Sequence, residues 1–213
     1  MKIKWLGHAS FLITSEGGTR IITDPYETNE RIKYGQIKEP ADVVTVSHGH
    51  SDHANVAAVQ GKPAVVKGTA EAGGIKFRGI AAHHDETGGS QRGSNIMFCF
   101  EVDGVRICHL GDLGHPLSQP QVKELGAVDV LMVPVGGFFT IDAKTASQLV
   151  EQVKPKVIIP MHYSSDRCAL PIAPVDDFLK GKANVSRLDS SEVEFKKGAL
   201  PAGTRIMVLK PAL

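Results

Sequence analysis

The chain contains 213 residues, of which 42% are hydrophobic and 22% charged, and its formal net charge at pH 7 is +1. This length and balance predict one globular domain over residues 1–213 with a sizeable core. The near-neutral charge supplies no broad field to attract nucleic acid or an acidic membrane, so we expect neither as a partner.

The N-terminal part of the chain predicts a small meander followed by a loop. Residues 2–6, 10–14 and 19–23 have the apolar pattern of short strands, and two adjacent glycines between the last two supply the positive φ that hairpin turns require. Residues 24–41 are polar and contain two prolines and a glycine, which is typical of a loop that borders a site.

The middle of the chain predicts one buried strand, a histidine-rich loop and further strands. Residues 42–46 are apolar and lead directly into the loop, and residues 54–60 follow as a short helix that ends at Gly61. Four more strands are expected at 63–66, 75–80, 96–102 and 105–110. The last two are joined by Asp-Gly, a strong hairpin signal.

The C-terminal part alternates strands and helices. A buried strand is expected at 129–133, and Asp142 caps a helix with apolar residues at helical spacing that ends at Pro155. The remaining elements are expected to be a strand at 157–159, a helix at 174–180 and strands at 193–195 and 205–209. Strands in meanders first and alternating with helices later favour two sheets with helices outside.

The cysteines and the apolar runs indicate the compartment. Three cysteines without a CxxC pair, in a chain that shows no signal peptide, favour reduced thiols in a cytoplasmic protein. No apolar run approaches the roughly 20 residues needed to span a bilayer. We therefore expect a cytoplasmic protein without a membrane anchor.

The most informative segment is the loop directly after the strand at 42–46. It places three imidazoles and a carboxylate within six positions, at His48, His50, Asp52 and His53. These donors suit Zn(II), Mn(II) or Fe(II), and a Gly-containing loop held by a rigid strand can turn alternate side chains toward one point. The pattern predicts a metal site rather than a plain polar loop.

The His-x-His-x-Asp-His motif after an apolar strand resembles the signature of the metallo-β-lactamase fold. The segments Trp5–Ser10 and Ile21–Pro25 are similar to the subfamily that includes L-ascorbate-6-phosphate lactonase and many metal-dependent hydrolases. The resemblance covers nearly the whole chain. It implies an α/β fold, a four-layer αβ/βα sandwich of two mostly antiparallel or mixed sheets with helices on the outer faces.

The family pattern also implies where the remaining ligands lie. A third histidine comes from His83 or His84, and we prefer His84 because residues 81–83 continue a strand whereas His84 opens the polar loop. Asp112 matches the carboxylate that bridges two ions, and His162 matches the last ligand. The expected ligands are His48, His50, His84 and Asp112 for one ion, and Asp52, His53, Asp112 and His162 for the other.

Five further residues are candidates for supporting roles. Asp24 resembles the early family aspartate that orients a ligand histidine. His8 and His115 lie in Gly-containing loops and are candidate proton or hydrogen-bond donors, with His115 preferred. Arg92 is a candidate for binding a substrate carboxylate or phosphate, and His109 is expected to be structural.

We expect a hydrolase with two divalent ions per chain, zinc first and manganese or iron as alternatives. An open position at each ion would hold a bridging hydroxide as nucleophile, and Asp52 would face that water. The expected substrate is a small ester, lactone, amide or phosphoester, because no appended domain suggests a polymer. An iron-dependent redox enzyme and a non-catalytic metal-bound binding protein remain as alternatives, and the sequence also allows a homo-oligomer.

Overall fold

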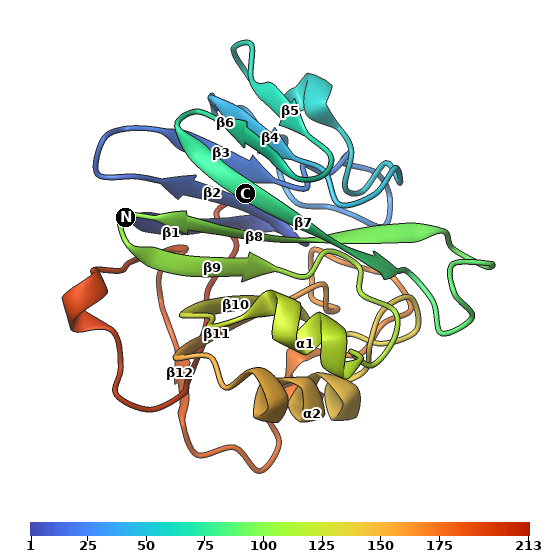
Figure 1. The fold of residues 1–213 in the computed structure, drawn as a ribbon. Helices are drawn as coiled ribbons and strands as arrows, with labels where there is room; N and C mark the ends of the chain where they lie inside the picture. The colour runs from blue at the N-terminus through green and yellow to red at the C-terminus, as the bar shows by residue number, and fades with distance from the viewer.

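Two β-sheets pack face to face in the computed structural model, which describes residues 1–213 (Figure 1). The first sheet has six strands, in the order β13 (Glu192–Glu194), β1 (Lys2–Gly7), β2 (Ser10–Thr14), β3 (Arg20–Thr23), β4 (Val43–Thr45) and β5 (Ala64–Val66). The strand β13 comes from the C-terminal part of the chain, so the two ends of the sequence are joined within this sheet.

The second sheet has eight strands. Their order is β12 (Val185–Arg187), β14 (Arg205–Val208), β11 (Val157–Met161), β10 (Val130–Pro134), β9 (Val105–His109), β8 (Ser94–Val102), β7 (Ile75–His83) and β6 (Ala70–Ala72). Both sheets contain parallel and antiparallel pairs. The prediction of two mixed sheets in a metallo-β-lactamase-type sandwich is therefore confirmed.

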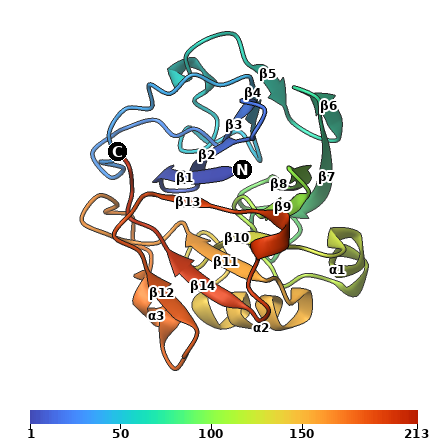
Figure 2. The same cartoon turned by 90° about the vertical axis from the view of Figure 1, so that its left-hand side faces the viewer.

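Three α-helices lie on the outer side of the second sheet (Figure 2). They are α1 (Gln119–Leu125), α2 (Ala143–Val153) and α3 (Val175–Leu179), and two 3₁₀ turns occur at Val56–Ala58 and Lys197–Ala199. Asp142 caps α2 as predicted, because its carboxylate accepts a hydrogen bond from the backbone N–H of Thr145 at 2.8 Å. None of the helices has the length and apolar composition that crossing a membrane requires.

Successive side chains along the strands of the first sheet point to opposite faces and so belong to two different hydrophobic clusters. Ile21 and Val43 belong to the 45-residue cluster that fills the space between the sheets. Their neighbours Ile22 and Val44 belong to a separate cluster of 13 residues on the other face. Each face of the sheet is thus buried, which explains why these strands contain continuous apolar runs.

No α-helix covers the outer face of the first sheet. The loop after β3 covers it instead, with Tyr26, Tyr34 and Ile37 packed into the 13-residue cluster. The ring of Tyr34 lies directly over Gly7, where a Cβ atom would come within 2.5 Å of the Tyr34 Cγ atom. The predicted helix at 54–60 was wrong in type, because only the 3₁₀ turn Val56–Ala58 forms there.

Besides the 3₁₀ turn Lys197–Ala199, three elements were not predicted from the sequence: β6, α1 and β12. The two strands have three residues each, which is too short for an alternation pattern. The helix α1 did have a signal, because Ser118 and Gln121 form a capping box and Pro120 occupies the first turn.

The six strands that lead into the candidate site all end at the same edge of the molecule. In the first sheet β1 and β3 both run antiparallel to β2, and β4 is parallel to β3. In the second sheet β7 and β9 both run antiparallel to β8, and β9, β10 and β11 are parallel. The segments that follow β1, β3, β4, β7, β9 and β11 contain every histidine and aspartate of the candidate site, which is why residues far apart in sequence meet there.

Candidate metal centre

Asp24 fixes the histidine loop from the end of β3. It is fully buried and has a φ of 39°, a conformation that aspartate tolerates better than most residues. Its carboxylate accepts hydrogen bonds from the backbone N–H and the hydroxyl of Ser47 and from the Nδ1 atom of His53, the last at 2.9 Å. One carboxylate therefore holds both ends of the loop that carries the motif.

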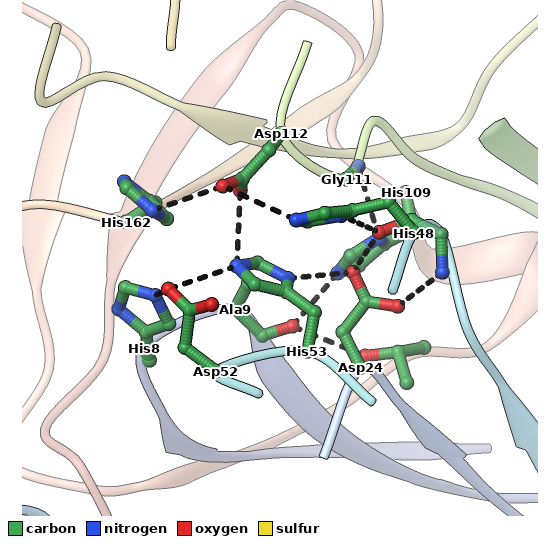
Figure 3. A network of polar contacts seen from close by, with 12 residues as sticks. His8, Ala9, Asp24, His48, Asp52, His53, His109, Gly111, Asp112 and His162 are labelled. Carbon is green, nitrogen blue, oxygen red and sulfur yellow. Dashed lines mark hydrogen bonds and ion pairs between the residues drawn. The ribbon is translucent and has the colours of Figure 1, made fainter. Parts of the chain in front are cut away.

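These contacts also determine which ring nitrogens are available. Nδ1 of His53 donates a hydrogen bond to Asp24 (Figure 3). In the neutral ring its Nε2 atom therefore carries no proton, and the Nε2 lone pair is available to a metal. The Nδ1 atom of His48 lies 3.0 Å from the Ser47 hydroxyl oxygen, whose proton is donated to Asp24. Asp24 thus orients His53 directly and His48 through Ser47, leaving Nε2 of each ring for a ligand.

The turn after β9 places Asp112 with similar precision. Gly111 has a φ of 55°, and a Cβ atom there would lie 2.4 Å from Oδ1 of Asn95, so the turn requires glycine. The same Asn95 oxygen accepts the backbone N–H of Asp112 at 2.9 Å. His109 accepts the N–H of Gly111 and donates to the carbonyl of Ala9, so its role is structural in this arrangement.

Three groups of potential ligand atoms form at the shared edge of the sheets. One of them, Asp24 with His48 and His53, is already linked through the hydrogen bonds of Asp24 and Ser47, and the other two are the sets that could hold ions. Within each set, all ligand atoms lie within 4.8 Å of one another. The first set is His48, His50 and His84, and the second is His8, Asp52, His53 and His162. All seven side chains are buried or partly buried except His50, which is exposed.

Asp112 lies between the two sets. Its Oδ2 atom is 3.2 Å from Nε2 of His84 in the first set and 3.2 Å from Nε2 of His162 in the second. Its Oδ1 atom is 3.2 Å from Nε2 of His53 (Figure 3). A carboxylate in this position can serve ions on both sides, and its negative charge reduces their mutual repulsion.

The residues present fit a divalent metal. Buried ring nitrogens without a hydrogen-bond partner occur in His8, His48, His53, His84 and His162, and Oδ1 of Asp112 is also unpartnered. Buried polar atoms are normally paired, so this concentration of unpaired donors at one point fits a bound cation. The donors are nitrogen and oxygen without a thiolate, which suits Zn(II), Mn(II) or Fe(II).

Burial and neighbouring charges shift the pKa values of the candidate ligands in different directions. Burial lowers the pKa of His8 to about 4 and that of His48 to about 3. Burial alone would raise the pKa of Asp112, but the charges of His162 and His53 hold it well below its usual range. Burial would likewise lower the pKa of His53, yet Asp112 and Asp24 raise it well above the ordinary value.

Three predicted candidates lie outside the two sets. His83 is exposed and belongs to neither set, whereas its neighbour His84 is buried against Asp112. The ring of His115 is occupied on both sides, because Nδ1 bonds the carbonyl of Pro116 and Nε2 accepts the backbone N–H of His83. Arg92 lies over the ring of Phe139, 5.5 Å from its centroid, beside a cavity rather than among the ligand atoms.

Two supporting residues were missed by the sequence analysis. Asn95 is fully buried and bonds both the carbonyl of Leu110 and the N–H of Asp112. Ser47 links Asp24 to His48. A polar residue next to the motif could have suggested Ser47, but nothing in the sequence around Asn95 distinguishes it from a strand residue near a turn.

We expect Asp24→Ala to weaken metal binding by about 10- to 100-fold, because it removes the carboxylate that orients two candidate ligands. It should also lower the free energy of unfolding by at least about 2 kcal/mol, since buried donors of Ser47 and His53 lose their acceptor. Chelator competition and chemical denaturation measure the two effects. Asp42→Ala is the control, because Asp42 accepts one backbone hydrogen bond at the opposite end of β4; equal metal loss in both variants would contradict the role of Asp24.

Acid should destabilise the metal-free protein between about pH 6 and pH 4. The folded-state pKa values of His8 and His48, about 4 and about 3, lie below the unfolded value of about 6.5, so their contribution is complete above pH 6.5 and is lost as the pH falls. His53 has a raised pKa, so its contribution is complete below pH 6.5 and does not offset the loss. Melting temperatures of chelator-treated protein from pH 8 to pH 4 check this, and a constant or rising value on acidification would contradict it.

Comparison with known proteins shows similarity over nearly the whole chain. Residues 2–162 match the family model described as β-lactamase superfamily domain. A UPF0173 metal-dependent hydrolase from Archaeoglobus fulgidus is 32% identical over 93% of this chain and 97% of its own length. Another from Carboxydothermus hydrogenoformans is 34% identical over 78% of this chain and 85% of its own length.

One solved structure is similar across both sheets. It is a Thermotoga maritima protein assigned to the Zn-dependent hydrolases of the metallo-β-lactamase superfamily, with a TM-score of 0.80 and 38% identity. The match covers 98% of this chain and 97% of that one.

Proposed function

Since the chain belongs to the β-lactamase superfamily and, within it, to the UPF0173 metal-dependent hydrolases, we propose that it is a hydrolase whose active site holds two divalent metal ions. The superfamily expected from the histidine motif is confirmed by the family model. The narrower resemblance to L-ascorbate-6-phosphate lactonase stays a prediction.

The observation that carries the proposal is the position of Asp112. It lies within 3.2 Å of a ring nitrogen from each set, and the rings around it have buried nitrogens with no other partner. A structural site for a single ion would need only one set of four donors. Two sets that meet at one carboxylate are the arrangement expected of a two-ion hydrolytic centre.

The residues would divide between the ions by set. His48, His50 and His84 would hold the first ion, Asp52, His53 and His162 the second, and Asp112 both. Ions held in this way supply Lewis acidity and bring the pKa of water from about 15.7 toward about 7. The chain's own residues provide orientation: Asp24 fixes the rings of His48 and His53, and Asn95 fixes the backbone at Asp112.

A cavity of about 350 Å³ beside the centre favours a small-molecule substrate. Its lining includes Asp85, the neighbour of His84, and Gly114, two residues beyond Asp112. Phe138 is 66% exposed at this cavity, and the guanidinium of Arg92 lies over the neighbouring ring. The rest of the lining is mostly polar and includes the carboxylates of Asp85, Glu86 and Asp142. A polar cavity with one guanidinium and an aromatic side suits a compact polar substrate such as an ester, lactone, amide or phosphoester.

The test is turnover by protein reconstituted with Zn(II), Mn(II) or Fe(II) on panels of lactones, phosphodiesters, amides and β-lactams. We expect hydrolysis of at least one class, abolished by chelation and restored by metal. His83→Ala is the matched control, because it removes a histidine next to the site that lies outside both sets. Metal-loaded protein that consumed O₂ and hydrolysed nothing would replace hydrolysis with iron-dependent oxidation.

A further inference from the structure

His8 lies among the second set although it is 40 residues before the histidine motif. Its side chain is completely buried, and neither ring nitrogen has a hydrogen-bond partner. Its Nε2 atom is 3.4 Å from Oδ2 of Asp52, and its ring centroid is 4.2 Å from that of His162 (Figure 3). The donor atoms of His8, Asp52, His53 and His162 all lie within 4.8 Å of one another.

The backbone holds His8 in this position from both sides. The residue lies in the irregular turn between β1 and β2 with a φ of 51°, a left-handed conformation that few non-glycine residues adopt. Its carbonyl accepts hydrogen bonds from Nε1 of Trp5 at 3.1 Å and from the backbone N–H of His162 at 3.3 Å. Residues kept in such conformations concentrate at functional sites.

This burial is unsuited to a proton donor. A general acid must reach the substrate or a water next to it, but the ring of His8 has no exposed surface and is enclosed by His53, His162 and Asp52. A neutral imidazole has one nitrogen lone pair, and binding a metal would give the buried lone pair of His8 the partner that it lacks. The neighbours within reach are themselves candidate ligands of the second ion.

We propose that His8 is an additional ligand of the second ion, an inference that rests on the two-ion site proposed above. The second ion then has five protein donors: His8, Asp52, His53, His162 and Asp112. Zinc rarely takes more than five, so no position is left there for substrate. The first ion keeps the open coordination position, on the side where His50 is exposed. The sequence predicted an open position at each ion, whereas this inference leaves one only at the first ion.

The experiment compares His8→Ala, His8→Gln and His8→Glu with the wild type and with His83→Ala. Glutamine and glutamate have the same shape, but only the carboxylate is a common ligand of these metals. If His8 only donates a hydrogen bond to Asp52, the opposite variant should be tolerated, because glutamine can donate to a carboxylate whereas glutamate repels it. The readouts are stepwise Co(II) affinity by chelator competition and the visible absorption of Co(II), which reports coordination number.

We expect wild type and His83→Ala to bind two Co(II) ions. His8→Ala and His8→Gln should each weaken one of the two by at least about 100-fold and change its absorption, because a direct ligand should matter more than an orienting partner. His8→Glu should recover most of the affinity.

Wild-type affinity in His8→Gln, with loss in His8→Glu, would overturn the ligand role in favour of positioning Asp52. Unchanged Co(II) binding in all three variants would overturn any role of His8 at the ion. If the wild type binds no Co(II), the two-ion function itself fails, and this inference fails with it. If His8→Ala does not fold, the comparison of the glutamine and glutamate variants decides the question.

Discussion

Asp112→Asn is expected to remove both ions and abolish hydrolysis, the largest effect of any single substitution in the chain. The variant keeps the shape of the side chain but loses the negative charge that both sets of donors share. We expect metal affinity to fall more than about 100-fold at both sites and kcat to fall by at least about 100-fold. Loss of a ligand that two ions share should cost more than loss of a residue that only orients a ligand. Elemental analysis and steady-state kinetics measure the two quantities.

Asp129→Asn is the matched control for this substitution. Asp129 is also a buried aspartate, and it forms ion pairs with Arg106 and Lys156. It precedes β10, however, and so lies at the edge of the sheet opposite to Asp112. This control should lose some stability and keep its metal. An Asp112→Asn protein with two ions and normal turnover would show that Asp112 is not a ligand.

His84→Ala should remove the first ion, whereas His83→Ala should leave both in place. The two histidines are adjacent, but His84 is buried with Nε2 at 3.2 Å from Asp112 and His83 is exposed. We expect His84→Ala to reduce metal content from about two to about one and to lower kcat by at least about 100-fold, since the first ion keeps the open position. The reverse result, with metal lost only from His83→Ala, would reassign the third ligand.

Local pattern was sufficient to predict most of the strands and the loop that carries the histidine motif. Strands such as β3 and β4 are short and apolar and end in sharp turns, so the positions of Asp24 and of the histidine loop follow from their sequence. The choice of His84 followed from the expected end of a strand at His83, and β7 does end there, with His83 exposed and His84 buried in the loop that follows. In these cases the information lies within a few residues of the donor.

The features that escaped prediction depend on contacts between distant segments. His8 was a candidate donor from the sequence, but its contact with His162 was not foreseen, because it arises from β1 and β11 ending at the same edge of two different sheets. Asn95 binds the turn at Asp112 across the β8–β9 hairpin. His115 follows Asp112 closely in sequence, yet its ring turns toward the backbone of His83 and Pro116. No local periodicity contains this information.

The most direct measurement is a crystal structure of zinc-loaded protein with anomalous diffraction recorded at the zinc edge. Two anomalous peaks are expected, one beside His48, His50 and His84 and the other beside Asp52, His53 and His162, with the Asp112 carboxylate between them. A single peak, or peaks remote from Asp112, would contradict the two-ion centre on which the proposed hydrolysis depends.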